Sequence, residues 1–174
     1  GCEVVAFDPV ADPALPEDTA GLYLGGGFPE VFAEELAANA SLRAGVAAAV
    51  ASGLPTVAEC AGLLYLAESL DGQPMAGALP IAAAMRPRLT LGYHEATAPA
   101  DTLLARAGER VRTHEFHRTG VTPGPGATVE PAWSVGDEGR PEGVSADPAG
   151  LGTPTVHAAY QHLHWAGSPR FAQR

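Results

Sequence analysis

Short apolar stretches alternate with helical patterns along the first third of the 174-residue chain. Residues 3–7, 21–24 and 55–58 are apolar and run into turn-forming residues, as buried strands do. Between them, residues 30–38 and 42–52 have the pattern of helices. The order strand, crossover helix, strand is typical of a parallel sheet with helices on its faces. We therefore expect an α/β fold with a mostly parallel sheet flanked by helices.

The rest of the chain has weaker patterns. We predict strands at 89–93 and 111–117, which are candidates for pairing, and turns over the Gly- and Pro-rich residues 120–154. The last segment with a clear secondary-structure pattern is 156–165. The sequence has no internal repeat and no linker long enough to divide it. Residues 1–174 are therefore expected to form a single domain.

Charge excludes several functions. The chain has 20 acidic and 10 basic residues, a net charge of −10, and all ten basic residues are Arg. A chain without Lys contains neither a GxxxxGK[ST] phosphate loop nor a lysine Schiff base. It also has no basic patch to follow a phosphate backbone, so nucleic acid is not an expected partner.

Hydropathy and cysteine content indicate the cellular compartment in which the chain works. The mean hydropathy is +0.03 and no apolar run reaches the ~18 residues of a membrane helix, so no membrane partner is expected. Cys2 and Cys60 are too few for a disulfide scaffold, and a reduced, cytoplasmic setting fits best. Because the sequence begins with Gly1 rather than Met and residues 3–7 already have a strand pattern, we expect a fragment of a longer chain.

Cys60 is the strongest candidate for a catalytic residue. It follows an apolar strand and precedes a helical pattern, with the small residues Ala61 and Gly62 directly after it. A tight strand-to-helix turn lifts a side chain clear of the sheet, at the positive end of a helix, where the thiolate is favoured. The backbone N–H of Ala61 would then point at an oxyanion. The alternative interpretation is a buried, inert cysteine.

Three glycines, Gly25, Gly26 and Gly27, follow the strand at 21–24. They are expected at the carboxyl edge of the sheet, where open α/β folds place their sites. Such a loop exposes backbone N–H groups and can supply a second oxyanion donor. A plain turn is the alternative. A phosphate-binding loop is the rival functional interpretation, although GxGxxG spacing and Lys are both missing.

A catalytic cysteine needs a base, and the chain contains six histidines. The strand period places Tyr160, His162 and His164 on one face of the last element. A late strand could thus bring an imidazole beside Cys60, forming the Cys–His pair that thiol acyl transfer uses. For any single histidine, the alternative is that it lies on a polar strand face and takes no part in catalysis.

Two histidine pairs are also candidate metal ligands. His162 and His164 form an H-x-H sequence, and His114 and His117 flank Glu115. Neither pair has a matched CxxC or HExxH partner. We therefore expect no metal in this chain.

Taken together, these segments resemble the class I glutamine amidotransferase domain of the cobyrinic (hydrogenobyrinic) acid a,c-diamide synthase family. The resemblance covers nearly the whole chain, in the family's order. The matching segments are GLYLGGGFPE at 21–30, AECAGLLYL at 58–66, PRLTLGY at 87–93, HEFH at 114–117 and YQHLH at 160–164. It implies a three-layer, flavodoxin-like fold with the nucleophile on a strand-to-helix elbow.

The resemblance also implies a glutaminase. Cys60 would attack the side-chain amide of glutamine, release ammonia and leave a γ-glutamyl thioester that water hydrolyses. His162 matches the family's histidine and would move the protons. The N–H of Ala61, with one from Gly26 or Gly27, would hold the oxyanion.

In the family, the ammonia passes to an ATP-dependent synthetase domain that amidates the a and c acetate groups of a corrinoid. That domain normally precedes the glutaminase and holds the P-loop, ATP and Mg²⁺, in agreement with the absence of Lys here. No cofactor is expected in this chain itself. Glutamine and the synthetase domain are its expected partners, and the corrinoid is reached only through that domain.

Three positions depart from the pattern of class I relatives. Most relatives have a Glu two residues after the catalytic histidine, and here that position is His164. A Cys–His dyad is therefore expected, with no orienting group assigned; His164, Glu115 and His117 are candidates for an orienting or rim role. Ala61 stands where family members often have Gly, and Leu63 where many other relatives have Gln.

Other functions stay open at this point. The glutaminase of cobyric acid synthase or of a nickel-sirohydrochlorin a,c-diamide synthase is the closest rival. A catalytically inactive module that only docks to the synthetase is another, and so is a peptidase of the same superfamily. Both cobyrinate and hydrogenobyrinate are open as acceptors, because the choice between them is expected to lie in the synthetase domain.

Overall fold

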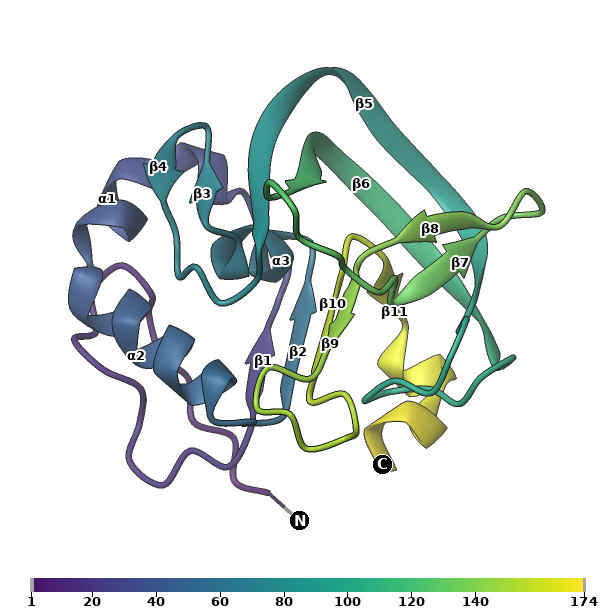
Figure 1. The fold of residues 1–174 in the computed structure, drawn as a ribbon, viewed down its shortest axis with the longest axis horizontal. Coiled ribbons are helices and arrows are strands. Elements are labelled where there is room, and N and C mark those ends of the chain that lie inside the picture. Colours follow the sequence, from purple (N-terminus) through teal and green to yellow (C-terminus); the bar gives the residue numbers. More distant parts are fainter. Residues whose placement is uncertain (1, 174) are drawn as a thin grey trace.

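The structure is a computed structural model that describes residues 2–173, with side chains from 2 to 171. Two sheets and a small group of helices make up the fold (Figure 1). The elements in chain order are β1 (Leu22–Leu24), the 3-10 helix η1 (Pro29–Val31), α1 (Ala33–Ala38), α2 (Ala40–Ala51), β2 (Thr56–Glu59), α3 (Ala61–Leu66), β3 (Ser69–Leu70), β4 (Gln73–Pro74), β5 (Ile81–Thr97), β6 (Arg110–Pro123), β7 (Trp133–Val135), β8 (Arg140–Glu142), β9 (Val144–Ala146), β10 (Val156–Ala159), β11 (His162–Leu163), and the 3-10 helices η2 (Trp165–Gly167) and η3 (Pro169–Gln173).

The first sheet contains the parallel strands, in the order β1-β2-β10-β9. Tyr23 of β1 lies beside Val57 of β2, and Val57 lies beside His157 of β10, all in parallel register. β9 is the antiparallel edge strand. The chain passes from β1 to β2 through α1 and α2, which is the kind of crossover that parallel neighbours require.

Both faces of this sheet are covered, because side chains alternate along each strand. Leu24 and Ala58 belong to the core cluster on the helical face. On the opposite face, the ring of His157 meets Trp133 edge-on, and Trp133 belongs to a second cluster with Phe171. The residues by which α2 enters the first cluster are buried and recur every fourth position: Leu42, Val46 and Val50.

The second sheet is built on the long antiparallel hairpin of β5 and β6, which arches over the rest of the fold (Figure 1). The register shifts between Met85 and Thr90, where an irregularity bends the pair. The two-residue strand β11 pairs with β6, and this places His162 opposite His114. The end of the chain is thereby attached to the hairpin.

The structure confirms the α/β class and corrects several predicted elements. Residues 3–7 form no strand, because no neighbouring strand pairs with them, and residues 3–6 are exposed. The segment 120–154 contains β7, β8 and β9 as well as turns. The last predicted element, 156–165, is divided into β10, β11 and the start of η2. The pairing of 89–93 with 111–117 is confirmed within the longer β5–β6 hairpin.

Helix α3 packs so closely on β1 that Gly62 leaves no room for a side chain. A Cβ on Gly62 would lie 2.6 Å from the Cβ of Leu24 and closer still to the Leu24 carbonyl oxygen. We expect Gly62→Ala to lower the free energy of unfolding by about 1–3 kcal/mol through overpacking. Urea denaturation followed by circular dichroism measures the change.

Gly45→Ala in α2 is the matched control, because a Cβ there meets nothing within 4 Å. Alanine in a helix interior is favoured over glycine, so this variant should gain about 0.5–1 kcal/mol. Equal stabilities for the two variants would contradict the tight contact between α3 and β1.

Candidate active site

Cys60 lies at a strained turn between β2 and α3. β2 ends at Glu59 and α3 begins at Ala61. The backbone of Cys60 has φ 50° and ψ −98°, a left-handed conformation that costs a residue with a side chain about 1–3 kcal/mol. Its N–H donates to the Ala159 carbonyl oxygen at 2.8 Å, which ties the turn to the end of β10. The strand-to-helix elbow predicted from the sequence is present.

Cys60 is a largely buried residue, with 6% of it exposed. Its Sγ lies 3.7 Å from the backbone carbonyl oxygen of Phe116 on β6. The partly buried imidazole of His162, on β11, approaches from the C-terminal part of the chain. The fold thus brings together the two residues that the sequence predicted as a pair, although 102 positions in numbering separate them.

The imidazole of His162 lies between the thiol of Cys60 and the carboxylate of Glu59. Hydrogen bonding to Cys60, and then to Glu59, raises the pKa of His162 to about 10, against the opposing effect of burial. The closest carboxylate contact is 3.8 Å, between His162 Nδ1 and Glu59 Oε2. Across the neutral pH range the imidazole is therefore protonated, and it can act as a proton donor next to the thiol.

The glycine loop after β1 completes the surroundings of the thiol. A Cβ on Gly26 would lie 2.6 Å from Cε1 of His162, and one on Gly27 would lie 3.6 Å from the Cβ of Ala61. The N–H of Gly62 donates to the Gly25 carbonyl oxygen at 3.2 Å, joining the loop to α3. Ala61 is the first residue of α3, so its N–H has no acceptor within the helix.

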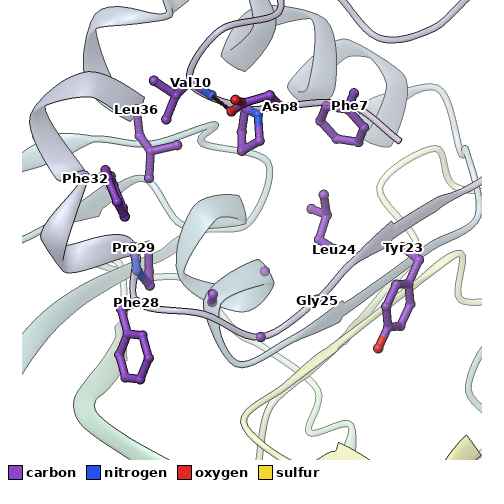
Figure 2. Close-up of a pocket in the computed structure, with 14 residues that line it drawn as sticks. Phe7, Asp8, Val10, Tyr23, Leu24, Gly25, Phe28, Pro29, Phe32 and Leu36 are labelled. Carbon is purple, nitrogen blue, oxygen red and sulfur yellow. Dashed lines mark hydrogen bonds between the residues drawn. The ribbon is translucent and has the colours of Figure 1, made fainter. Parts of the chain in front are cut away.

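A cavity of about 520 Å³ lies beside the glycine loop. Figure 2 shows Leu24 pointing toward the N-terminal segment around Phe7, while Tyr23 on the same strand points the other way. Further apolar lining comes from Phe32 and Leu36. The lining includes backbone of the glycine loop and of α3 but, among the residues that the structure describes, neither Cys60 nor His162. Gly26 lines this cavity and also meets the His162 ring, so the cavity borders the imidazole through the glycine loop.

Glu59 is a residue of this site that the sequence analysis missed. It is 6% exposed, and its Oε2 accepts a hydrogen bond from the Tyr23 hydroxyl at 2.8 Å. Its Oε1 accepts from the backbone N–H of Leu163 at 3.1 Å. A signal was present in the sequence, because a carboxylate at the end of an apolar strand, directly before Cys60, needs buried partners.

The predicted rim residues Glu115 and His117 belong to a buried network on β6. Glu115 Oε1 lies 3.0 Å from His117 Nε2, and its Oε2 lies 2.7 Å from a guanidinium nitrogen of Arg140 and 3.3 Å from His94 Nε2. Burial raises the pKa of Glu115, but the His117 hydrogen bond and the Arg140 charge bring it below its ordinary value. His117 stacks on Tyr160 with ring centroids 3.6 Å apart. Phe116, which lies between Glu115 and His117 in the sequence, carries the carbonyl that faces the thiol, so the network borders the site.

His164, the other candidate for orientation, is exposed. A Cβ on Gly167 would lie 2.6 Å from His164 Nδ1, so the ring packs against the turn of η2. The carboxylate that lies beside the His162 ring is that of Glu59, 3.8 Å from Nδ1.

The described residues contain no group of three or more His, Cys, Asp or Glu side chains arranged to hold a metal ion. In the same part of the chain, no helix has the length and apolarity needed to cross a membrane.

The sequence of the chain matches a family model over residues 1–170, and the family is described as the CobB/CobQ-like glutamine amidotransferase domain. The chain belongs to this family. Its fold is the α/β fold expected for a class I glutamine amidotransferase domain. A solved structure, that of PurLQS from Thermotoga maritima, agrees with this fold with a TM-score of 0.61 at 18% identity, covering 84% of this chain and 70% of that one.

Named relatives of this amidotransferase domain are diamide synthases. The chain is 59% identical over its full length to the hydrogenobyrinate a,c-diamide synthase of Thermobifida fusca, strain YX. It is 40% identical, over 99% of its length, to the cobyrinate a,c-diamide synthase of a Synechococcus strain. The chain spans 36% and 38% of these two relatives, so about two thirds of each lies outside the similarity.

The protonation of His162 provides a direct test of the site. Its folded pKa lies above the ordinary 6.5, so the bound proton favours the folded state fully below pH 6.5. This contribution is lost as the pH rises from 6.5 to about 10. We expect NMR titration of the imidazole to give a midpoint near 10, and a lower midpoint in Cys60→Ala because the largest cause of the shift is removed. An ordinary midpoint in the unmodified chain would contradict the thiol–imidazole contact.

Proposed function

We propose that this chain hydrolyses glutamine to glutamate and ammonia through a thioester on Cys60. The thiolate attacks the side-chain amide carbon and forms a C–S bond, while His162 protonates the leaving nitrogen so that ammonia departs. Water then adds to the γ-glutamyl thioester, His162 takes a proton from it, and glutamate leaves as the thiolate is restored.

The proposed oxyanion site consists of backbone groups around the elbow. The N–H of Ala61, together with one from Gly26 or Gly27, would bind the oxygen that becomes negative when the amide carbon turns tetrahedral. One such donor is worth about 3–4 kcal/mol of transition-state stabilisation. The contact of Gly26 with the His162 ring supports this assignment, because it keeps the loop beside the reacting groups.

A single observation carries the proposal. The thiol on the elbow and the imidazole of His162 interact, and this contact is the largest cause of the raised pKa of His162. A protonated imidazole beside a thiol is the arrangement that thiol acyl transfer requires.

The ammonia is proposed to serve an ATP-dependent synthetase part of the same enzyme. The named relatives are a,c-diamide synthases almost three times as long as this chain, which leaves room for such a part. That part would hold ATP and Mg²⁺ and activate the a and c acetates of cobyrinic or hydrogenobyrinic acid in cobalamin biosynthesis. The glutaminase chain itself would need no cofactor, nucleic acid or membrane, and would act in the cytoplasm.

Replacing Cys60 tests the chemistry. Cys60→Ala should reduce glutamine-dependent ammonia release to background, because no thioester can form. His162→Ala should reduce it about 10²–10⁴-fold, the usual worth of a positioned acid–base group. Ammonia release measured with a coupled glutamate dehydrogenase assay gives both values.

Cys2→Ala is the matched control, because Cys2 is the chain's other free cysteine and is exposed, whereas Cys60 is buried. It should keep full activity and full labelling by a glutamine-analogue affinity reagent, and Cys60→Ala should lose the label. Labelling that persists without Cys60, or activity that survives its loss, would reject the mechanism.

Adding the synthetase part tests the partner. We expect it to raise the rate of glutamine hydrolysis, because docking partners commonly complete an active site of this kind. The measurement is ammonia release by the chain alone and with the synthetase part, with Cys60→Ala as the blank. A chain that is inactive in both conditions would be a docking module, and the proposal would fail.

A further inference from the structure

Glu59 is the carboxylate closest to the reacting imidazole. Its Oε2 lies 3.8 Å from His162 Nδ1 and also accepts a hydrogen bond from the Tyr23 hydroxyl. Its Oε1 accepts from the N–H of Leu163, the residue next to His162 in β11. One carboxylate group thus contacts both the ring of the histidine and the backbone that carries it.

The position of this carboxylate is itself well fixed. Glu59 is the last residue of β2 and pairs in register with Ala159 of β10. Only 6% of it is exposed, and the Tyr23 hydroxyl on the neighbouring strand holds one of its oxygens. Burial and the Glu59 bond raise the pKa of Tyr23 to about 12, so this hydroxyl stays a donor at neutral pH.

The other titratable groups around His162 do not offer the same contact. Cys60 lies at the elbow and is the reacting partner. The His114 ring on β6 lies with its centroid 5.9 Å from that of His162 and supplies no negative charge. Two residues beyond His162, His164 is exposed and packs against Gly167.

We propose that Glu59 is the positioning residue of this site, holding the His162 ring and its strand in the orientation that the thiol chemistry needs. The carboxylate comes from the residue directly before the nucleophile rather than from the strand of the histidine. This proposal rests on the glutaminase function proposed above, since it assigns a task within that reaction.

Glu59→Gln is the decisive variant, because it removes the charge and keeps the shape and an oxygen acceptor for the Leu163 N–H. We expect kcat for glutamine hydrolysis to fall about 100-fold, the scale of loss from misplacing a reacting group by about 1 Å. KM for glutamine should stay within about threefold, because Glu59 contacts the histidine rather than the substrate. Glu34→Gln, on the exposed side of α1, is the control and should match the unmodified chain.

Two further measurements need no glutamine turnover. In Glu59→Gln, the NMR titration midpoint of His162 should be lower than in the unmodified chain. The pH profile of Cys60 alkylation by iodoacetamide should also shift. If Glu59 had only a structural role, Glu59→Gln would lower the melting temperature but leave the His162 midpoint and the pH profile of Cys60 alkylation unchanged. Glu59→Asp, which keeps the charge, should return the His162 midpoint toward its original value.

These readouts separate the two proposals. An unmodified chain without glutaminase activity, both alone and with the synthetase part, would overturn the proposed function, and the His162 titration would still decide the role of Glu59. Full kcat and an unchanged His162 midpoint in a folded Glu59→Gln variant would overturn the positioning role, and leave the glutaminase assignment intact.

Discussion

The site depends on the parallel pairing of β2 with β10. The hydrogen bond from the Cys60 N–H to the Ala159 carbonyl extends this pairing past the end of β2. It fixes the elbow at the point where the chain leaves the sheet, and it sets the start of the short connection that leads to β11 and His162. Neither strand alone would place both reacting groups. The two apolar clusters, one on each face, stabilise the sheet, and the sheet determines where the thiol and the imidazole meet.

Several carboxylates are buried around this pairing, and each has its own partners. Glu59 is bound by a hydroxyl and a backbone N–H, and Glu115 by histidine and arginine side chains. Glu142 accepts from the backbone N–H of Tyr160 at 2.7 Å, and burial raises its pKa to about 7. Together with Glu59, this last carboxylate fixes the two ends of the connection between β10 and β11. A buried acid without such partners would cost several kcal/mol.

The sequence was sufficient to predict the parts of the site that are local. The turn at Cys60 and the glycine loop each depend on neighbouring residues, so periodicity and residue type indicate them. Glu59 could not be assigned in this way, because its partner Leu163 is 104 residues away and only β-pairing brings the two together. The apolar run at 3–7 was wrongly predicted as a strand for the same physical reason: a strand exists only where another strand pairs with it. The Gly- and Pro-rich stretch that hides β7, β8 and β9 has too little alternation to indicate strands.

β11 has only two residues, and its ladder partner is β6 of the long hairpin. The histidine strand is therefore tied to both sheets at once, to the hairpin by this ladder and to β2 by the bond between the Leu163 N–H and Glu59. The hairpin also reaches the sulfur, through the carbonyl of Phe116. The spacing of the reacting pair is thus a joint property of the two sheets, and any displacement of one sheet against the other would change it.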